Sequence, residues 1–209
     1  MIKIKKFTFN PFQENTYVVS NESGSCFIVD PGCYTSAEED ALKDYIEQND
    51  MKPEALLNTH CHIDHVFGNH FITSEYGLKP YIHKDENPVL EAVTQVAHMY
   101  GLNYSKSPEP HYYPGDTMQL LGLEWQIIYS PGHSPGHIML YQKDAAVLIA
   151  GDVIFKMSIG RTDLPGGNHA ELLRNITHKV FTLPENTRVL PGHMEETTVG
   201  FEKKNNPFF

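Results

Sequence analysis

The chain has little cysteine and no long apolar run. Its three cysteines, Cys26, Cys33 and Cys61, are too few for a disulfide framework, and their odd number leaves at least one thiol free. No apolar stretch reaches membrane-spanning length, and the first residues alternate apolar and charged side chains without the apolar core of a signal peptide. We therefore expect a cytoplasmic protein with reduced thiols and no membrane partner.

Basic residues are also scarce. Sixteen lysines and arginines stand against 26 aspartates and glutamates, which gives a formal net charge of −10. This balance opposes nucleic acid as a partner and fits a small-molecule substrate better. The 209 residues suit one domain with a sizeable core, and no internal repeat or low-complexity tract divides them. We predict a single domain over residues 1–209, and the sequence leaves its oligomeric state open.

Apolar patterns predict a mixed α/β chain. A capping box of Ser36 and Glu39 predicts one amphipathic helix. A second helix is expected to start with Asn87 as its cap and Pro88 at its first position, and to end at Gly101. A third should follow a glycine-rich loop at residues 158–168. Strands are expected at residues 2–9, 16–20, 26–29, 55–58, 80–83, 117–121, 124–129, 138–141, 145–150 and 187–190.

The densest group of chemically active side chains lies in residues 59–65, directly after an apolar run. Three imidazoles and one carboxylate occur there within six positions: His60, His62, Asp64 and His65. Imidazole and carboxylate suit zinc or iron better than calcium, and the thiol of Cys61 has no nearby cysteine partner. One ion cannot use all four groups and stay open to substrate, so we expect a pair of metal ions.

Further candidate ligands follow other predicted strands. His133 and His193 each come after a Pro-Gly dipeptide, which predicts a tight turn that holds an imidazole at a sheet edge, and Asp152 follows another apolar run. Asp30 has two open interpretations: it begins a Pro-Gly turn, or its carboxylate orients a ligand imidazole. The other histidines are expected to be packed or solvated, and His137 to support a ligand at most.

This set resembles the metallo-β-lactamase superfamily, whose His-x-His-x-Asp-His motif, later His, bridging Asp and final His all match, and the resemblance covers the whole chain. It implies an αββα four-layer sandwich with the metals at one edge of two mixed sheets. It also implies that Asp152 bridges two ions, and it marks Asp64 and Asp152 as the catalytic carboxylates. The implied ligands are His60, His62 and His133 for one ion, and Asp64, His65 and His193 for the other.

Residues 158–167 and 197–208 resemble more closely the short, single-domain glyoxalase II-like hydrolases. That resemblance implies a hydroxyacyl thioester substrate such as S-lactoylglutathione. The two-domain enzymes of that class usually carry Lys and Tyr where Arg161 and Asp163 stand here. Arg161 is the candidate for binding a substrate carboxylate, and an ion pair with Asp163 is the equal alternative.

The expected chemistry is thioester hydrolysis by a hydroxide that bridges two divalent ions, with zinc as the first expectation and iron or manganese as alternatives. A thiol departs as thiolate without a dedicated acid, whereas an amide nitrogen needs a proton. The rival interpretation is a persulfide dioxygenase-like oxidoreductase with one iron held by His60, His133 and Asp152. A binding protein with a structural metal is disfavoured because it would close the site with four ligands.

Overall fold

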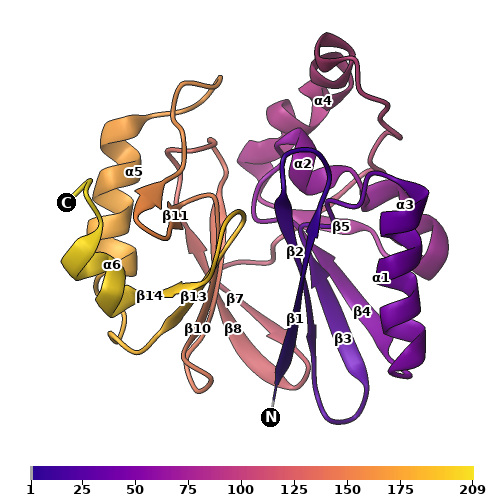
Figure 1. Cartoon of the computed structure of the whole chain (residues 1–209), viewed down its shortest axis with the longest axis horizontal. Coiled ribbons are helices and arrows are strands. Elements are labelled where there is room, and N and C mark those ends of the chain that lie inside the picture. The colour runs from indigo at the N-terminus through magenta and orange to yellow at the C-terminus, as the bar shows by residue number, and fades with distance from the viewer. Residues whose placement is uncertain (1) are drawn as a thin grey trace. The chain divides into compact units, whose positions relative to one another are not determined.

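The computed structural model describes residues 2–209 and divides the chain into two compact units (Figure 1). The first unit comprises Met1–Tyr113 with Leu120–Gly122, and the second comprises Pro114–Gln119 with Leu123–Phe209. Each unit has its own six-stranded sheet and its own helices, so the α/β class predicted from the sequence is confirmed. The assignment of one domain to the whole chain stays a prediction.

The sheet of the first unit has the strand order β1-β2-β3-β4-β5-β6. These strands are β1 (Lys3–Phe9), β2 (Glu14–Ser20), β3 (Ser25–Val29), β4 (Lys52–Leu57), β5 (Pro80–Ile82) and β6 (His111–Tyr112). β1 to β3 pair antiparallel, whereas β3 to β6 are parallel neighbours. Because neighbouring parallel strands end at the same edge of a sheet, Asp30 after β3 and the loop after β4 emerge together; the Asp30 amide donates to the Leu57 carbonyl at 2.9 Å.

Helices α1 (Ser36–Gln48), α2 (Ile63–Val66), α3 (Asn69–Tyr76) and α4 (Asn87–Tyr100) belong to the first unit, with a 3-10 turn at Lys84–Glu86. Figure 1 shows α1 and α3 beside its sheet. Their contact is apolar: Leu42 of α1 and Ile72 of α3 form one buried cluster with Val18, Ile28 and Leu56 of the strands. Burial of such side chains is the main stabilising term for this layer.

The capping box predicted for α1 is wrong by one residue. Thr35 is the cap, and Glu38 completes the box by accepting the Thr35 amide at 2.9 Å. Ser36 is by residue type at least as good a cap as Thr35, and tertiary contacts select Thr35, since the Glu38 carboxylate also accepts the amides of Asn10 and Tyr34. Similarly, α4 starts one residue earlier than predicted, whereas its end at Gly101, with φ 67°, is confirmed.

The sheet of the second unit has the order β14-β13-β10-β9-β8-β7. Its strands are β7 (Thr117–Leu120), β8 (Leu123–Tyr129), β9 (Ile138–Gln142), β10 (Val147–Gly151), β13 (Arg188–Pro191) and β14 (Thr197–Thr198). β10 and β13 pair parallel, whereas the β9–β10, β13–β14 and β8–β9 pairs are antiparallel, so Asp152 and His193 follow strands that end at the same edge. The Gly192 amide donates to the Gly151 carbonyl at 2.8 Å and fixes that alignment.

Helices α5 (His169–Asn175) and α6 (Val199–Asn205) complete the second unit, together with a π-helical turn at Ile176–Val180. A short hairpin of β11 (Ile154–Phe155) and β12 (Ser158–Ile159) stands apart from the main sheet. β12 occupies the first part of the segment predicted as a glycine-rich loop, and α6 was not foreseen. Within residues 2–209, no helix combines the length and the apolar character needed to cross a membrane.

Candidate metal centre

The loop after β4 places four of the predicted ligands in the first unit. His60 and His65 are fully buried, and their ring centroids lie 4.1 Å apart. The His62 ring lies 4.8 Å from that of His60. The chain then enters α2, which places Asp64 Oδ2 at 3.6 Å from His65 Nε2. Extended backbone followed by one helical turn therefore gathers three imidazoles and a carboxylate in a short segment.

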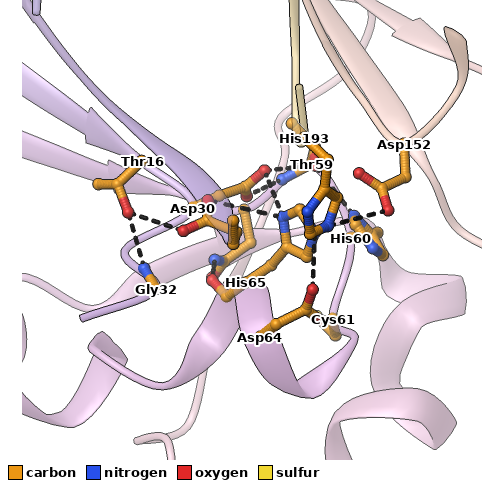
Figure 2. Close-up of polar contacts among 12 residues, drawn as sticks. Thr16, Asp30, Gly32, Thr59, His60, Cys61, Asp64, His65, Asp152 and His193 are labelled. Carbon is orange, nitrogen blue, oxygen red and sulfur yellow. Dashed lines mark hydrogen bonds and ion pairs between the residues drawn. The ribbon is translucent and has the colours of Figure 1, made fainter. Parts of the chain in front are cut away.

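Asp30 orients two of these imidazoles. Its Oδ1 accepts the Thr59 amide at 2.7 Å, and its Oδ2 accepts the Thr59 hydroxyl at 2.6 Å and the His65 Nδ1 proton at 3.2 Å (Figure 2). Because the Thr59 hydroxyl gives its proton to Asp30, its oxygen accepts from His60 Nδ1 at 3.1 Å. Both Nδ1 atoms thus carry protons, and both Nε2 atoms keep the lone pair that a metal ion requires. Asp30 itself has φ 48°, in the left-handed region where Asp is among the better tolerated residues, and the chain bends there.

A buried carboxylate that the sequence did not reveal, Glu14, lies behind this turn. Glu14 Oε1 is 3.9 Å from His65 Nδ1, and Glu14 Oε2 accepts the Thr16 hydroxyl at 2.9 Å. The Thr16 oxygen in turn accepts the Gly32 amide at 2.9 Å (Figure 2). Burial raises the pKa of Glu14 well above its ordinary value, and nearby His65 opposes that shift. All seven residues of β2 are buried, so no alternation of polar and apolar residues marks Glu14 as unusual.

The thiol of Cys61 does not add to the candidate ligands. It is buried in an apolar cluster with Ile63 and Val66, and burial raises its pKa well above the ordinary value, with Glu86 and Asp30 adding to the shift. The Cys61 amide donates to the fully buried carboxylate of Glu86 at 2.7 Å. Glu86 thus holds the backbone between His60 and His62, a role that no local sequence signal indicated.

The second unit arranges its three predicted ligands around one carboxylate oxygen. Asp152 Oδ2 lies 3.5 Å from His133 Nε2 and 3.6 Å from His193 Nε2. Both distances exceed those of good hydrogen bonds. They approach the separation of about 3.4 Å between two atoms that bind one tetrahedral ion through bonds of about 2.0–2.1 Å. His133 Nδ1 donates to the Arg161 carbonyl at 2.7 Å, which leaves Nε2 with its lone pair facing the carboxylate. This donor set fits a transition metal ion.

His137 supports Asp152 in this unit. Its Nε2 accepts the Asp152 amide at 3.0 Å, and the ring is fully buried. The sequence predicted at most a supporting role for His137, next to His133, whereas the structure assigns it to the backbone of another predicted ligand. The chain after β12 also approaches Asp152 and His133 closely. A Cβ atom at Gly160 would overlap the Asp152 carbonyl oxygen and lie 3.0 Å from His133 Nδ1.

The geometry of both units can be compared with known proteins. The family model of the metallo-beta-lactamase superfamily matches residues 9–193. The chain belongs to this superfamily. Among curated relatives, the probable metallo-hydrolase YqgX of Bacillus subtilis is 37% identical over 210 residues, covering 99% of this chain and 97% of that protein. Hydroxyacylglutathione hydrolase GloC of Haemophilus influenzae is 32% identical over 201 residues, covering 94% and 93%.

Two solved structures resemble this metallo-β-lactamase-superfamily chain over nearly its whole length. The B3 metallo-beta-lactamase BLEG-1 has a TM-score of 0.89 and 33% identity, with 99% of each chain covered. TTHA1623 in a di-iron-bound form has a TM-score of 0.88 and 35% identity, with 98% of this chain and 100% of that chain covered. These likenesses confirm the metallo-β-lactamase fold predicted from the motifs.

Arg161 in this superfamily member forms the ion pair that was the alternative to substrate binding. Its guanidinium donates to both carboxylate oxygens of Asp163, at 2.7 and 2.8 Å. This hydrogen bonding holds the pKa of Asp163 at about 2, below its ordinary value. Both side chains are exposed, and a substrate-binding role for Arg161 stays a prediction. The sequence did not reveal that the Arg161 carbonyl accepts a proton from His133.

Proposed function

We propose that this member of the metallo-β-lactamase superfamily is a metal-dependent thioesterase that hydrolyses a hydroxyacyl thioester such as S-lactoylglutathione. The orientation of the predicted ligand imidazoles carries the proposal. The Nδ1 protons of His60, His65 and His133 are all taken by protein acceptors, so each ring offers Nε2 to an ion. Solvated histidines on a polar surface loop would donate their Nδ1 protons to water, and protein acceptors would not fix the tautomers of three rings.

We assign the ligands as the superfamily motif does. The support is the family match together with the donor sets within each unit. Asp152 is assigned to both ions, and its shared Oδ2 agrees with that assignment. Zinc is the first choice, with iron or manganese as alternatives, since a 35%-identical structure is described in a di-iron-bound form. The proposed sets are His60, His62 and His133, and Asp64, His65 and His193.

Two bound divalent ions would lower the pKa of a water molecule toward neutrality and polarise a carbonyl oxygen. The chain's own residues prepare this chemistry. Asp30, acting directly and through Thr59, keeps the rings of His60 and His65 from rotating, and the Arg161 carbonyl does the same for His133. Pre-set ligand orientation removes a reorganisation cost at the moment of reaction.

A thioester is favoured over an amide because its leaving group departs as thiolate, with a pKa of about 8.5, and needs no dedicated acid. The 32% identity to hydroxyacylglutathione hydrolase GloC over 94% of the chain supports the same class. Arg161 is proposed to contact a substrate carboxylate, for which it would exchange its exposed partner Asp163.

The test compares three reactions of protein loaded separately with zinc, manganese or iron. Thiol release from S-lactoylglutathione and from a neutral thioester is followed under nitrogen, beside hydrolysis of a chromogenic β-lactam and oxygen consumption with glutathione persulfide. We expect zinc- or manganese-loaded protein to release thiol without oxygen. Activity of the iron form alone, coupled to oxygen consumption, would instead support the oxidoreductase. Preferential β-lactam hydrolysis would assign the chain to the activity named for BLEG-1.

A further inference from the structure

Glu202 of α6 is a fully buried carboxylate that takes no part in the proposed reaction. Its Oε1 accepts the Thr197 hydroxyl at 2.6 Å. Its Oε2 accepts the Met157 amide at 3.0 Å and the Asn206 side-chain amide at 2.9 Å. A buried carboxylate is tolerated only where donors replace water, and here three donors from separate positions do so.

Asn206 extends this contact to the next residue of the β11–β12 hairpin. Its side-chain amide also donates to the Ser158 carbonyl at 3.0 Å. Glu202 and Asn206 together therefore bind the amide of Met157 and the carbonyl of Ser158, which are consecutive residues. Met157 has φ 60°, a backbone conformation that side chains with a Cβ atom rarely adopt, and its side chain is exposed. Side-chain packing thus contributes little to this turn, and the hydrogen bonds from α6 hold it.

The candidate ligands of the second unit, His133, Asp152 and His193, form its half-site. The hairpin is joined at both ends to parts of this half-site. Only Val153 separates Asp152 from β11, and Gly160 and Arg161 directly follow β12. The Arg161 carbonyl accepts the His133 Nδ1 proton at 2.7 Å, and Gly160 packs against the Asp152 carbonyl. A shift of the hairpin would therefore move both the partner of His133 and the backbone around Asp152.

Helix α6 has an anchor of its own that does not depend on the hairpin. The Val199 amide donates to the Thr187 carbonyl at 3.0 Å, and the Gly200 amide donates to the Glu185 carbonyl at 2.9 Å. A Cβ atom on Gly200 would lie 2.9 Å from the Glu185 side chain, so this approach requires glycine. The helix is thus a fixed base from which Glu202 and Asn206 reach the hairpin.

We propose that residues 197–206 form a positioning clamp for the metal half-site of the second unit. Glu202 and Asn206 are positioning residues that act through Met157 and Ser158 on the His133–Arg161 contact. This assigns a role to residues of the segment 197–208, which have no role in the proposed reaction. The activity readout of the clamp rests on the proposed function, whereas its structural readout does not.

The structural test uses Asn206→Ala, with Asn205→Ala as the matched control, because the exposed Asn205 side-chain amide donates to the Phe201 carbonyl of its own helix and not to the hairpin. Hydrogen exchange is measured by mass spectrometry on metal-free protein. We expect exchange in residues 156–163 to rise at least about tenfold in Asn206→Ala. Peptides from β10 and β13 should stay unchanged, and the control should match wild type.

The second test asks whether a conservative change restores the clamp. Glu202→Gln keeps one carbonyl oxygen for Met157 and Asn206 while its amide donates to Thr197, whereas Glu202→Ala loses all three contacts. In metal-loaded protein we expect Glu202→Ala and Asn206→Ala to lower kcat for thioester hydrolysis about tenfold, the scale of lost ligand-orienting contacts. Glu202→Gln should stay within about twofold of wild type.

Three results would overturn the clamp. Exchange in residues 156–163 would stay at the wild-type rate in Asn206→Ala, exchange would rise evenly through the unit, or Glu202→Gln would be as defective as Glu202→Ala. If Glu202→Ala does not fold, the pair Asn206→Ala and Asn205→Ala decides alone. If wild-type protein releases no thiol with any metal, the proposed function fails, and the exchange test still decides the clamp.

Discussion

The two units present their candidate ligands in different ways. In the first unit, four candidate ligands lie within six positions that span a loop and the start of α2, and a side chain orients two of them: Asp30 contacts His65 directly and His60 through Thr59. In the second unit, three ligands follow three separate strands, and His133 is oriented by a backbone carbonyl. A half-site oriented by side chains is sensitive to substitution of those side chains, whereas one oriented by backbone is sensitive to changes in the path of the chain.

The largest effect is expected from a substitution of Asp152, whose carboxylate lies near both histidines of the second half-site. Asp152→Asn should lower thioesterase activity more than about a thousandfold, since loss of one preorganised electrostatic contact already costs about a hundredfold to a thousandfold. Its Oδ2 is the atom close to both His133 and His193, so the loss affects two ligands at once. His193→Ala is the control and should lose mainly one ion. Metal content by mass spectrometry checks this, and one ion per fully loaded wild-type chain would refute the two-metal assignment.

A backbone change should be the next most damaging. Gly160→Ala would push a Cβ atom into the Asp152 carbonyl and against His133, so the loop must move away and carry the Arg161 carbonyl with it. We expect about a hundredfold lower kcat, because a displacement of about 1 Å can cost that much. Gly115→Ala is the control at a position where an added Cβ atom meets no other atom within 4 Å. Equal activity of Gly160→Ala and wild type would show that the backbone does not orient this half-site.

The matching change in the first unit is Asp30→Asn. Asp30 accepts with both oxygens, whereas a carboxamide has one: its NH2 group would face either the Thr59 amide or the Thr59 hydroxyl and His65 Nδ1. Either orientation sets donor against donor and weakens the contacts that fix the tautomers of His60 and His65. We expect activity and metal affinity to fall about tenfold to a hundredfold. Thr59→Val, which removes only the link to His60, should fall less. Metal titration with a competing chelator measures the metal affinity of both variants. A larger loss of affinity in Thr59→Val than in Asp30→Asn would contradict Asp30 as the residue that orients both rings.

The smallest expected effect concerns Arg161, whose side chain and carbonyl point to different roles. Arg161→Ala keeps the carbonyl that binds His133 and removes the guanidinium, so kcat should change little while KM for anionic thioesters rises about tenfold. Asp163→Asn releases the guanidinium from its partner and should lower that KM slightly. Kinetics with anionic and neutral thioesters separate the two roles. Equal KM changes on both substrate types would mean that Arg161 serves only the ion pair.

Three buried carboxylates near the candidate ligands, Glu14, Glu86 and Glu202, could not be predicted from the sequence, because the groups they contact are far away in the chain. Glu86 binds the Cys61 amide across 25 residues, and Glu202 binds the Met157 amide across 45. Glu14 lies in a strand that is buried throughout, where no periodic pattern marks it. Each of these carboxylates is ordinary in its local sequence and becomes unusual only through burial.

The sequence by itself determined the α/β class, the family and the identity of the candidate ligands, because imidazoles and carboxylates after apolar runs form a local pattern. Tertiary structure decided which imidazole nitrogen His60, His65 and His133 offer, since Asp30 and the Arg161 carbonyl reach these histidines only after the chain has folded. It also decided between two possible helix caps, Thr35 and Ser36, where the contacts of Glu38 select Thr35. The sequence specifies the type of each residue. Burial and hydrogen-bond partners arise only when folding brings distant segments together.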